Sequence, residues 1–288
     1  MPFDISKANR LKAIEELLDD PTPSVRKAIL VELGNLGEEG RRFILNCCRS
    51  GNLMVRRHAH EVLAVLDKDS PVNMFHQFIH SLNYELESGY ILLSRIDNGN
   101  LDVSEYIQKL DEMATRCQSL IYSPMSPREK CRVLNRVIFH EYGFTGNRAD
   151  FNNPKNTFLH SLFKTRKGLP ISLSILYLLV ARRLDMPLEP VGIPGRFMIG
   201  CFVEEKPFFI DVFDNGIFRS LEDVVYFIER NNMSVTLGLL GPCPVGEVLC
   251  RCCRNLSKQF ALLNEPAKAE LYGSFAHAFE AHFEKEST

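Results

Sequence analysis

The sequence predicts an α+β protein that is mostly helical. Apolar residues recur at helical spacing through most of the 288-residue chain, and one helix, expected over 170–184, is apolar on nearly every side. Two short runs of apolar, strand-forming residues, 197–203 and 208–212, predict adjacent strands joined by a turn at EEKP. Because a helix without a polar face must be buried on all sides, we expect the core to form around residues 170–184.

The composition is that of an ordinary globular protein, with 45% hydrophobic and 24% charged residues and a formal net charge of -2. Without a basic excess, the chain has no overall field that gathers nucleic acid or an anionic membrane. Neither a secretory leader nor an apolar run long enough to span a bilayer is found. The nine cysteines lie mostly inside periodic apolar segments, as reduced core thiols do. We therefore expect a cytoplasmic protein that binds neither nucleic acid nor membranes.

The N-terminal 66 residues contain a repeat with a period of 30 residues. SVRKAILVELGNLG (24–37) superimposes on MVRRHAHEVLAVLD (54–67), with turn-forming residues between the expected helices. The apolar positions that coincide are Val25 and Val55, Ile29 and Ala59, Leu33 and Leu63, and Leu36 and Leu66. Each unit resembles a HEAT-like pair of helices, although a generic four-helix cap gives nearly the same pattern. Two repeats are few, so we expect this region to depend on the rest of the chain for stability.

Charge and proline gather at DKDSP (67–71), where the apolar period stops, and this marks a domain boundary. A long ordered loop is expected over 142–156, which is rich in Gly, Asn and Asp, and long loops in compact domains are often functional. The remaining helices are expected over 72–93, 103–121, 127–141, 221–230, 244–263 and 266–284.

Cys250 and Cys253 form a C-x-x-C in LCRCCRNL. A structural zinc site needs four ligands, usually from a second such pair or a nearby pair of histidines, and neither accompanies these cysteines. We expect buried helical thiols here, and no metal or cofactor.

Several motifs in the second half of the chain resemble a known family. GFTGN, NNPKNTFLHSLFKTRKGLPISLSILYLLVARRLDMPLEPVGIPGRF, FIDVFDNG and RNL occur in the order and spacing of the SirB-type transglutaminase-like family of bacterial proteins. The similarity covers about residues 72–285. It implies a domain of the transglutaminase and papain-like protease type, with a buried central helix, a small antiparallel sheet packed on it, and a C-terminal helical pair of tetratricopeptide-like character.

Together, the repeat and the resemblance predict three parts. Residues 1–69 are expected to form HEAT-like helical repeats. Residues 70–240 are expected to form the transglutaminase-like domain, and residues 241–288 a tetratricopeptide-like helical hairpin.

The catalytic members of this superfamily carry a cysteine at the start of the central helix, with a histidine and an aspartate on the adjacent sheet. The helix N-terminus favours the thiolate, the histidine moves the proton, and the aspartate orients the ring. This sequence departs from the pattern twice. The helix start GLPIS contains no cysteine, and the family's PGHF reads PGRF, so that Arg196 stands where the base is expected. Arginine stays protonated and cannot act as a general base.

Asp211 matches the position of the orienting aspartate. If 197–203 and 208–212 pair as a hairpin, Arg196 lies either directly opposite Asp211 or diagonal to it on the same face, depending on the register. Both registers permit a charge pair between the two side chains.

We expect a cytoplasmic bacterial protein that has lost acyl-transfer catalysis and serves as an interaction or regulatory module, with protein partners held by its helical repeats. The alternative is an amide or peptide hydrolase or acyltransferase, with Ser172 as nucleophile, His160 or an unidentified residue as base and Asp211 as orienter. Arg196 would then bind a carboxylate or phosphate of the substrate. For the two residues by themselves we favour the structural roles, in which Ser172 caps backbone N–H groups in the first turn of the helix and His160 is an ordinary packed or half-exposed histidine.

A third hypothesis is a sensor of a small anionic ligand. Arg196 would anchor the anion, since a guanidinium binds carboxylate and phosphate groups well. Asn147, Arg166 and Lys167 would complete the ligand site beside the start of the central helix, whose N-terminus favours negative charge.

Overall fold

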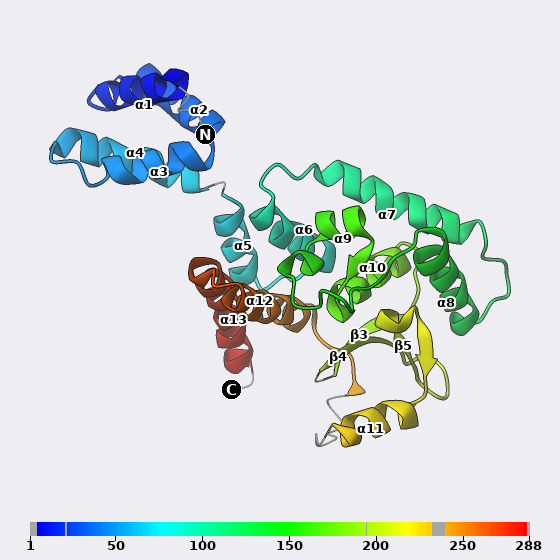
Figure 1. Ribbon diagram of the computed structural model, residues 1–288. Coiled ribbons are helices and arrows are strands. Elements are labelled where there is room, and N and C mark those ends of the chain that lie inside the picture. The colour runs from blue at the N-terminus through cyan, green and yellow to red at the C-terminus, as the bar shows by residue number, and fades with distance from the viewer. Residues whose placement is uncertain (1–4, 21, 69, 194, 232–239, 287–288) are drawn as a thin grey trace. The chain divides into compact units, whose positions relative to one another are not determined.

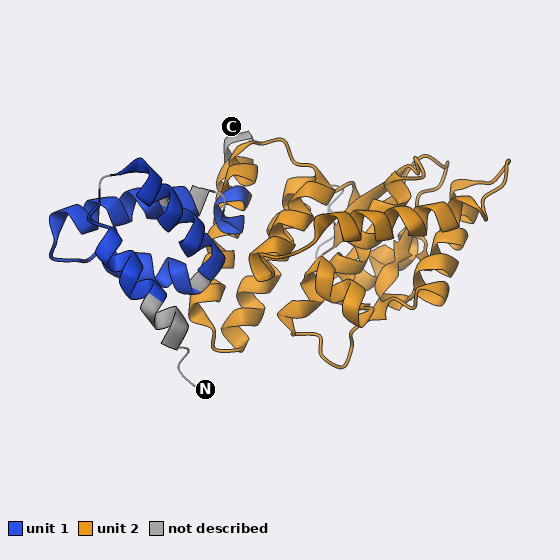
Figure 2. Ribbon diagram, turned by 90° about the horizontal axis from the view of Figure 1, so that it is seen from above, with its two compact units in different colours: residues 1–74 blue, residues 75–288 orange. Residues whose placement is uncertain are grey.

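The computed structural model describes residues 5–20, 22–68, 70–193, 195–231 and 240–286. It is an α+β structure, mostly helical with a small sheet (Figure 1). The chain divides into two compact units, residues 1–74 and residues 75–288 (Figure 2). Pro194, the first residue of the PGRF motif, lies outside the described residues.

The first unit contains α1 (Ile5–Leu17), α2 (Pro23–Leu36), α3 (Glu38–Cys47) and α4 (Leu53–Lys68). These helices share one apolar core, and every position that coincides in the 30-residue repeat lies in it or packs against it. The fully buried members include Ile29, Leu33 and Ala59. The repeated apolar positions therefore face a common interior.

The prediction of one helix over 72–93 is wrong, because the structure has two helices there. α5 (Pro71–His80) ends before Leu82, which has a left-handed backbone with φ 57°, and α6 (Leu86–Asp97) starts afresh. The side chain of Glu85 accepts hydrogen bonds from the backbone N–H groups of Glu87 and Ser88 and so caps α6. Apolar periodicity continues across this break, which is why the pattern alone did not reveal it.

The next segments lead to the centre of the second unit. α7 (Val103–Gln118) is followed by α8 (Pro127–Asn135), which continues as a π-helical stretch, Arg136–Glu141. Ser126 caps α8 in a reciprocal capping box with Glu129, as its sequence predicts. The long loop that follows contains only short elements, namely β1 (Thr145–Gly146) and a 3-10 turn over Pro154–Thr157.

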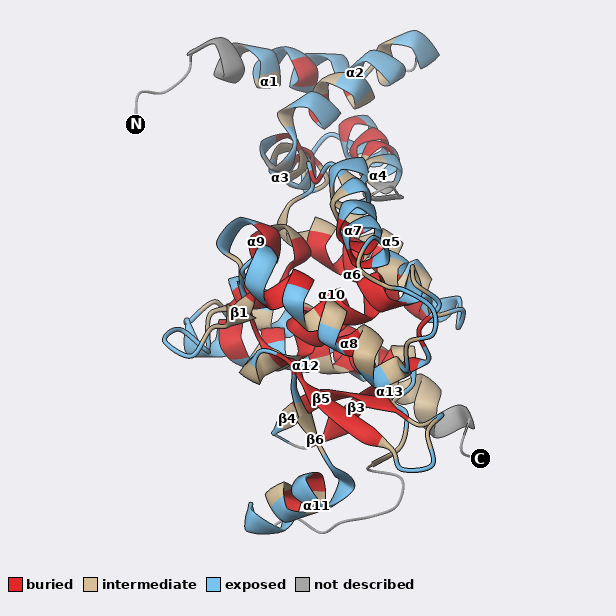
Figure 3. Ribbon diagram, turned by 90° about the vertical axis from the view of Figure 1, so that its right-hand side faces the viewer, coloured by how far each residue is buried: buried red, intermediate tan, exposed pale blue. Residues whose placement is uncertain are grey.

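The apolar helix forms the centre of the second unit, as expected. α10 (Pro170–Arg182) is preceded by α9 (Leu159–Thr165) and by β2 (Lys167–Gly168), which pairs in parallel with β1. All residues of α10 from Ile171 to Ala181 are buried, and Figure 3 shows this helix deep among other elements. The β1–β2 pair was not predicted, since two residues per strand leave no readable alternation.

A four-stranded antiparallel sheet lies beside α10. Its strands are β3 (Leu188–Ile193), β4 (Arg196–Cys201), β5 (Phe208–Asp211) and β6 (Ile217–Arg219), in that spatial order. Only β4 and β5 were predicted. α10 packs on one face of the sheet, while α11 (Leu221–Arg230) covers the other and forms an apolar cluster with it (Figure 1).

The C-terminal helices, α12 (Val245–Leu262) and α13 (Pro266–Glu286), pack closely along each other. The rings of Phe260 and Tyr272 stack between them, with centroids 5.5 Å apart. No helix among the described residues is both long enough and apolar enough to cross a membrane.

Candidate functional site

Arg196 and Asp211 form an ion pair on one face of the sheet. Ile199 lies opposite Ile210 in the β4–β5 ladder, so Arg196 is diagonal to Asp211 on the same face, which is one of the two registers considered above. Nη2 of Arg196 contacts Oδ2 of Asp211 and also lies 2.5 Å from Oδ2 of Asp214. A single guanidinium therefore holds two carboxylates.

The surroundings of Arg196 shift the pKa values of the two carboxyl groups that it contacts. Asp211 is fully buried, and this burial raises the pKa of its carboxyl group, although Arg196 opposes the shift. Asp214 is less buried, so the guanidinium groups of Arg196 and Arg148 outweigh burial and lower its pKa. The Arg196 guanidinium also lies 5.4 Å from the centre of the Phe227 ring on α11. Arg196 is thus tied into the fold as a permanent cation.

Ser172 is a helix-capping residue in this structure. Its Oγ accepts a hydrogen bond of 2.9 Å from the N–H of Leu169. The hydroxyl donates to the carbonyl oxygen of Asn156 at 2.7 Å and lies 3.2 Å from the carbonyl oxygen of Leu169. The side chain is fully buried, and all three partners are backbone groups. Nothing in this arrangement can take the hydroxyl proton, which a serine nucleophile requires.

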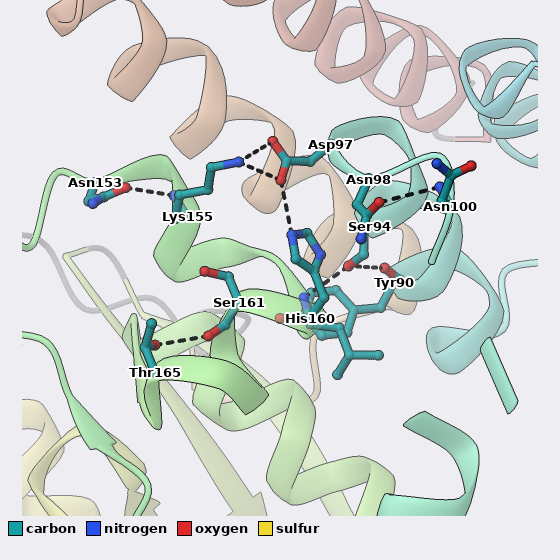
Figure 4. Close-up of polar contacts among 11 residues, drawn as sticks. Tyr90, Ser94, Asp97, Asn98, Asn100, Asn153, Lys155, His160, Ser161 and Thr165 are labelled. Carbon is teal, nitrogen blue, oxygen red and sulfur yellow. Dashed lines mark hydrogen bonds and ion pairs between the residues drawn. The ribbon is translucent and has the colours of Figure 1, made fainter. Parts of the chain in front are cut away.

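His160 contacts the last residue of α6. Its Nε2 lies 3.0 Å from Oδ2 of Asp97, and Nζ of Lys155 lies 2.7 Å from both oxygens of the same carboxylate (Figure 4). Asp97 is the last residue of α6, where a carboxylate is disfavoured by the helix dipole, and the ammonium group of Lys155 together with the hydrogen bond from His160 offsets this. Tyr90 and Ser94 on α6 also hold the segment before His160 by hydrogen bonds to Thr157 and Leu159.

The other expected ligand residues support loops. Nδ2 of Asn147 donates to Oδ1 of Asn156 at 2.8 Å and so closes the loop before α9. Arg166 ends α9 with φ 59°, and its guanidinium lies 4.7 Å from the centre of the Phe144 ring. Lys167 is exposed in β2. None of the three is among the residues that line the cavity beside Arg196.

That cavity, of about 510 Å³, opens at the N-terminus of α10 and was not foreseen from the sequence. One wall is a polar face of α12, and the opposite walls come from the start of α10, the β3–β4 hairpin and the loop before α9. The α12 residues are Arg251, Arg254, Asn255, Lys258 and Gln259. Four cations line the cavity, including Arg196, and no lining residue is acidic. We call it the cationic pocket.

The cations of the pocket differ in how far they are neutralised. Nε of Arg251 lies 2.8 Å from Oε1 of Glu247, and Nε of Arg254 lies 2.8 Å from Oε1 of Glu280. Lys258 makes no ion pair with any residue that the structure describes. The helical spacing of these residues was visible in CRCCRNLSKQF, but only the packing of α12 beside α10 shows that they converge on one cavity.

The pocket also contains an unpaired acceptor and, at the start of α10, N–H groups that no side chain of the N-cap residue accepts. Gln259 is 4% exposed, and its Oε1 has no hydrogen-bond partner among the described residues. Leu169 precedes α10 without a side-chain acceptor for the first N–H groups. Gly192 leaves room for the pocket: a side chain there would come within 2.8 Å of the Arg251 guanidinium. The pocket therefore offers positive charge and one buried acceptor.

The nine cysteines do not form a metal site in this structure. Within the described ranges, no three His, Cys, Asp or Glu side chains are grouped so that they could hold a metal ion. Cys250 and Cys253 are buried free thiols in α12.

Comparison with known proteins places the middle of the chain in a defined family. Residues 104–254, just over half of the chain, match the model of the Transglutaminase-like superfamily. The chain is 28% identical over 190 residues to a UPF0162 protein of Xylella fastidiosa (strain 9a5c), covering 62% of this chain and 66% of that protein. It is 36% identical over 131 residues to F-box only protein 21 of Mus musculus, covering 43% of this chain and 20% of that protein. No solved structure matches the chain.

Proposed function

The chain belongs to the transglutaminase-like superfamily, and we propose that it is a member without acyl-transfer activity that acts as an interaction or regulatory module. The observation that carries this proposal is the state of the two residues at the expected catalytic positions. The hydroxyl of Ser172 is engaged by backbone groups, and Arg196 is held by two carboxylates. A serine without a base and a permanent cation cannot perform nucleophilic acyl transfer.

The alternative, a hydrolase or acyltransferase with Ser172, His160 and Asp211, has less support. Each of the three side chains has a different partner: backbone groups for Ser172, Asp97 for His160, and Arg196 for Asp211. A catalytic triad needs its nucleophile and base within hydrogen-bond reach of each other.

The cationic pocket supports binding as the remaining role of this site. It lies where the central helix of the fold begins, and its lining combines three cations of α12 and Arg196 of β4 with apolar side chains. This favours an anionic ligand, as in the sensor hypothesis, with Arg196 as the one expected ligand residue that lines the pocket. Asn147, Arg166 and Lys167 would then act only by shaping the loops nearby.

We also propose that the first unit is a pair of HEAT-like repeats and that α12 and α13 form a tetratricopeptide-like hairpin. The shared core of the repeated positions supports the first point. So does a contact between repeats: Nη1 of Arg26 lies 2.9 Å from Oε2 of Glu61. Such repeats would hold a protein partner, and the buried free thiols agree with a reducing, cytoplasmic location.

The test is an assay of amide chemistry on the purified chain. A glutamine-containing peptide is incubated with the protein and a primary amine, and ammonia release and peptide mass are followed. We expect neither hydrolysis nor amine incorporation above the protein-free rate. Turnover that is lost in Ser172→Ala but kept in Ser174→Ala, a buried serine of the same helix, would overturn the proposal.

A further inference from the structure

We propose that the cationic pocket binds an acidic peptide segment in extended conformation, with carboxylates toward α12 and apolar side chains toward α10 and the β3–β4 hairpin. This inference rests on the proposed function, because it names the ligand of a site that is taken to bind without chemistry. It is carried by the arrangement of charge, apolar surface and one unpaired acceptor within the second unit.

The positive charges of the cationic pocket are spread along α12 and are not gathered at one point. Arg251, Arg254 and Lys258 follow one face of α12, and seven residues of helix cover about 10 Å. A compact anion would meet only part of this row. In an extended chain, side chains two positions apart lie on the same face and about 7 Å apart, so two carboxylates of one peptide segment can meet two of these cations.

Most of the apolar lining of the pocket comes from the elements other than α12. Leu169 and Ile171 at the start of α10, Ile193 and Phe197 on the hairpin, and Phe151 from the loop line it. An extended peptide with alternating acidic and apolar residues presents carboxylates on one face and apolar groups on the other. It therefore matches both kinds of lining, and Phe151, which is 45% exposed, is the apolar side chain most available to it.

Gln259 points to a ligand that can also donate a hydrogen bond. Only 4% of this residue is exposed, and its Oε1 lacks a hydrogen-bond partner among the described residues. A buried unpaired acceptor costs free energy, and a backbone N–H of a bound peptide would satisfy it. A carboxylate or an inorganic anion without a proton cannot supply that donor.

The start of α10 provides a further attraction for the same ligand. No side chain of the N-cap residue caps the first N–H groups of α10, and the positive end of a helix dipole favours a carboxylate. Arg196 also lines the pocket. Its Nη2 is occupied by Asp211 and Asp214 and its Nε is buried, which leaves Nη1 for a ligand.

The experiment measures fluorescence anisotropy of a labelled peptide of alternating glutamate and leucine, mixed with the full-length protein at low salt. Matched peptides replace glutamate by glutamine or leucine by serine. We expect saturable binding of the glutamate–leucine peptide and weaker binding of both analogues, because each analogue loses one wall of the pocket. A protein that binds the glutamine–leucine peptide equally well would overturn the role of charge.

Two variants locate the binding. Lys258→Gln removes an exposed cation that has no ion pair among the described residues, so the fold should be unaffected and the affinity should fall about three- to tenfold. Gln259→Met removes the unpaired acceptor at similar volume, so binding should weaken while stability is kept or increased. Lys164→Gln, which removes an exposed cation on α9 outside the pocket, is the control and should bind like the parent. Equal losses in the control and Lys258→Gln would contradict the assignment.

Binding measurements with other anions distinguish the acidic peptide from the alternative ligands. Inorganic phosphate or citrate that binds while the peptide does not would reject the peptide but keep a non-catalytic binding site. A thymidine oligonucleotide that binds more tightly than the peptide would also reject the inference. Recovery of cleaved or amine-modified peptide by mass spectrometry would instead reject the proposed function itself.

Discussion

Arg196 and Asp211 form an ion pair diagonally across the β4–β5 hairpin, and the carboxylate of the pair is fully buried. From the family resemblance, we expect a proton-transferring base and its orienting partner at these positions. The chain has instead a permanent cation and a carboxylate that is removed from water. Such a pair fixes geometry and cannot shuttle a proton.

Removing the arginine should be costly. In Arg196→Ala, Asp211 stays buried with only the more distant guanidinium of Arg219, whose Nε lies 4.0 Å from Oδ2 of Asp211, and we expect the free energy of unfolding at neutral pH to fall by about 3–5 kcal/mol. Urea unfolding followed by circular dichroism measures this. In the double variant Arg196→Ala/Asp211→Asn, part of the loss should be recovered, since the uncompensated charge is gone.

Arg148→Ala is the matched control for that change. Arg148 also contacts Asp214, but its side chain is 65% exposed, so its loss should change stability by less than about 1 kcal/mol. If Arg148→Ala and Arg196→Ala were equally destabilising, burial of Asp211 would not be the cause.

Two serines of α10 should respond differently to substitution. Ser172→Ala leaves the N–H of Leu169 and the carbonyl oxygen of Asn156 without their partner, which should cost about 1–3 kcal/mol. Ser174 is equally buried, but its Oγ has no hydrogen-bond partner among the described residues, so Ser174→Ala should be neutral or stabilising. Thermal unfolding of both variants tests this, and the reverse order would contradict a capping role for Ser172.

The contacts of Asp97 with His160 and Lys155 predict that the stability of the fold depends on pH. Burial opposes ionisation, but hydrogen bonds from His160 and Lys155 outweigh it and lower the pKa of Asp97 below its ordinary value of 3.8. A carboxyl group with a lowered pKa in the folded state stabilises the fold above its ordinary pKa, and this contribution is lost as the pH falls through the folded value. Asp97→Asn should therefore be destabilised at neutral pH, and the difference from the parent should shrink below about pH 4.

Urea unfolding at several pH values measures this difference. Glu105→Gln is the control, because Glu105 forms an exposed ion pair with Lys109 within one helix and should contribute little. A constant difference between Asp97→Asn and the parent down to the lowest pH would show that the charge of Asp97 is not what stabilises the cluster.

The cysteines should react slowly in the folded protein. Burial raises the pKa of Cys250 to about 12 and that of Cys243 to about 11, and the thiolate is the reactive form. Of the nine cysteines, seven are buried, and only Cys48 and Cys243 are partly exposed. A thiol titration with a disulfide reagent near pH 8 should thus label those two first and the rest only after denaturation. Fast labelling of more than two thiols in the native protein would contradict this packing.

The sequence by itself determined the helical class of the protein, its buried central helix and the departure from the catalytic pattern. A helix with no polar face has only one favourable environment, so α10 could be placed at the core without coordinates. The replacement of a base by Arg196 is a statement about residue chemistry, which needs no structure. The family resemblance that revealed this replacement lies in a contiguous block of sequence.

Tertiary structure decided which side chains meet. The break between α5 and α6 depends on capping by Glu85, which the apolar pattern does not encode. The partners of His160 and Ser172 come from α6 and from the loop before α9, and the cationic pocket requires α12 to lie beside the start of α10. These contacts join residues far apart in the chain, and local propensity and periodicity carry no information about such distances.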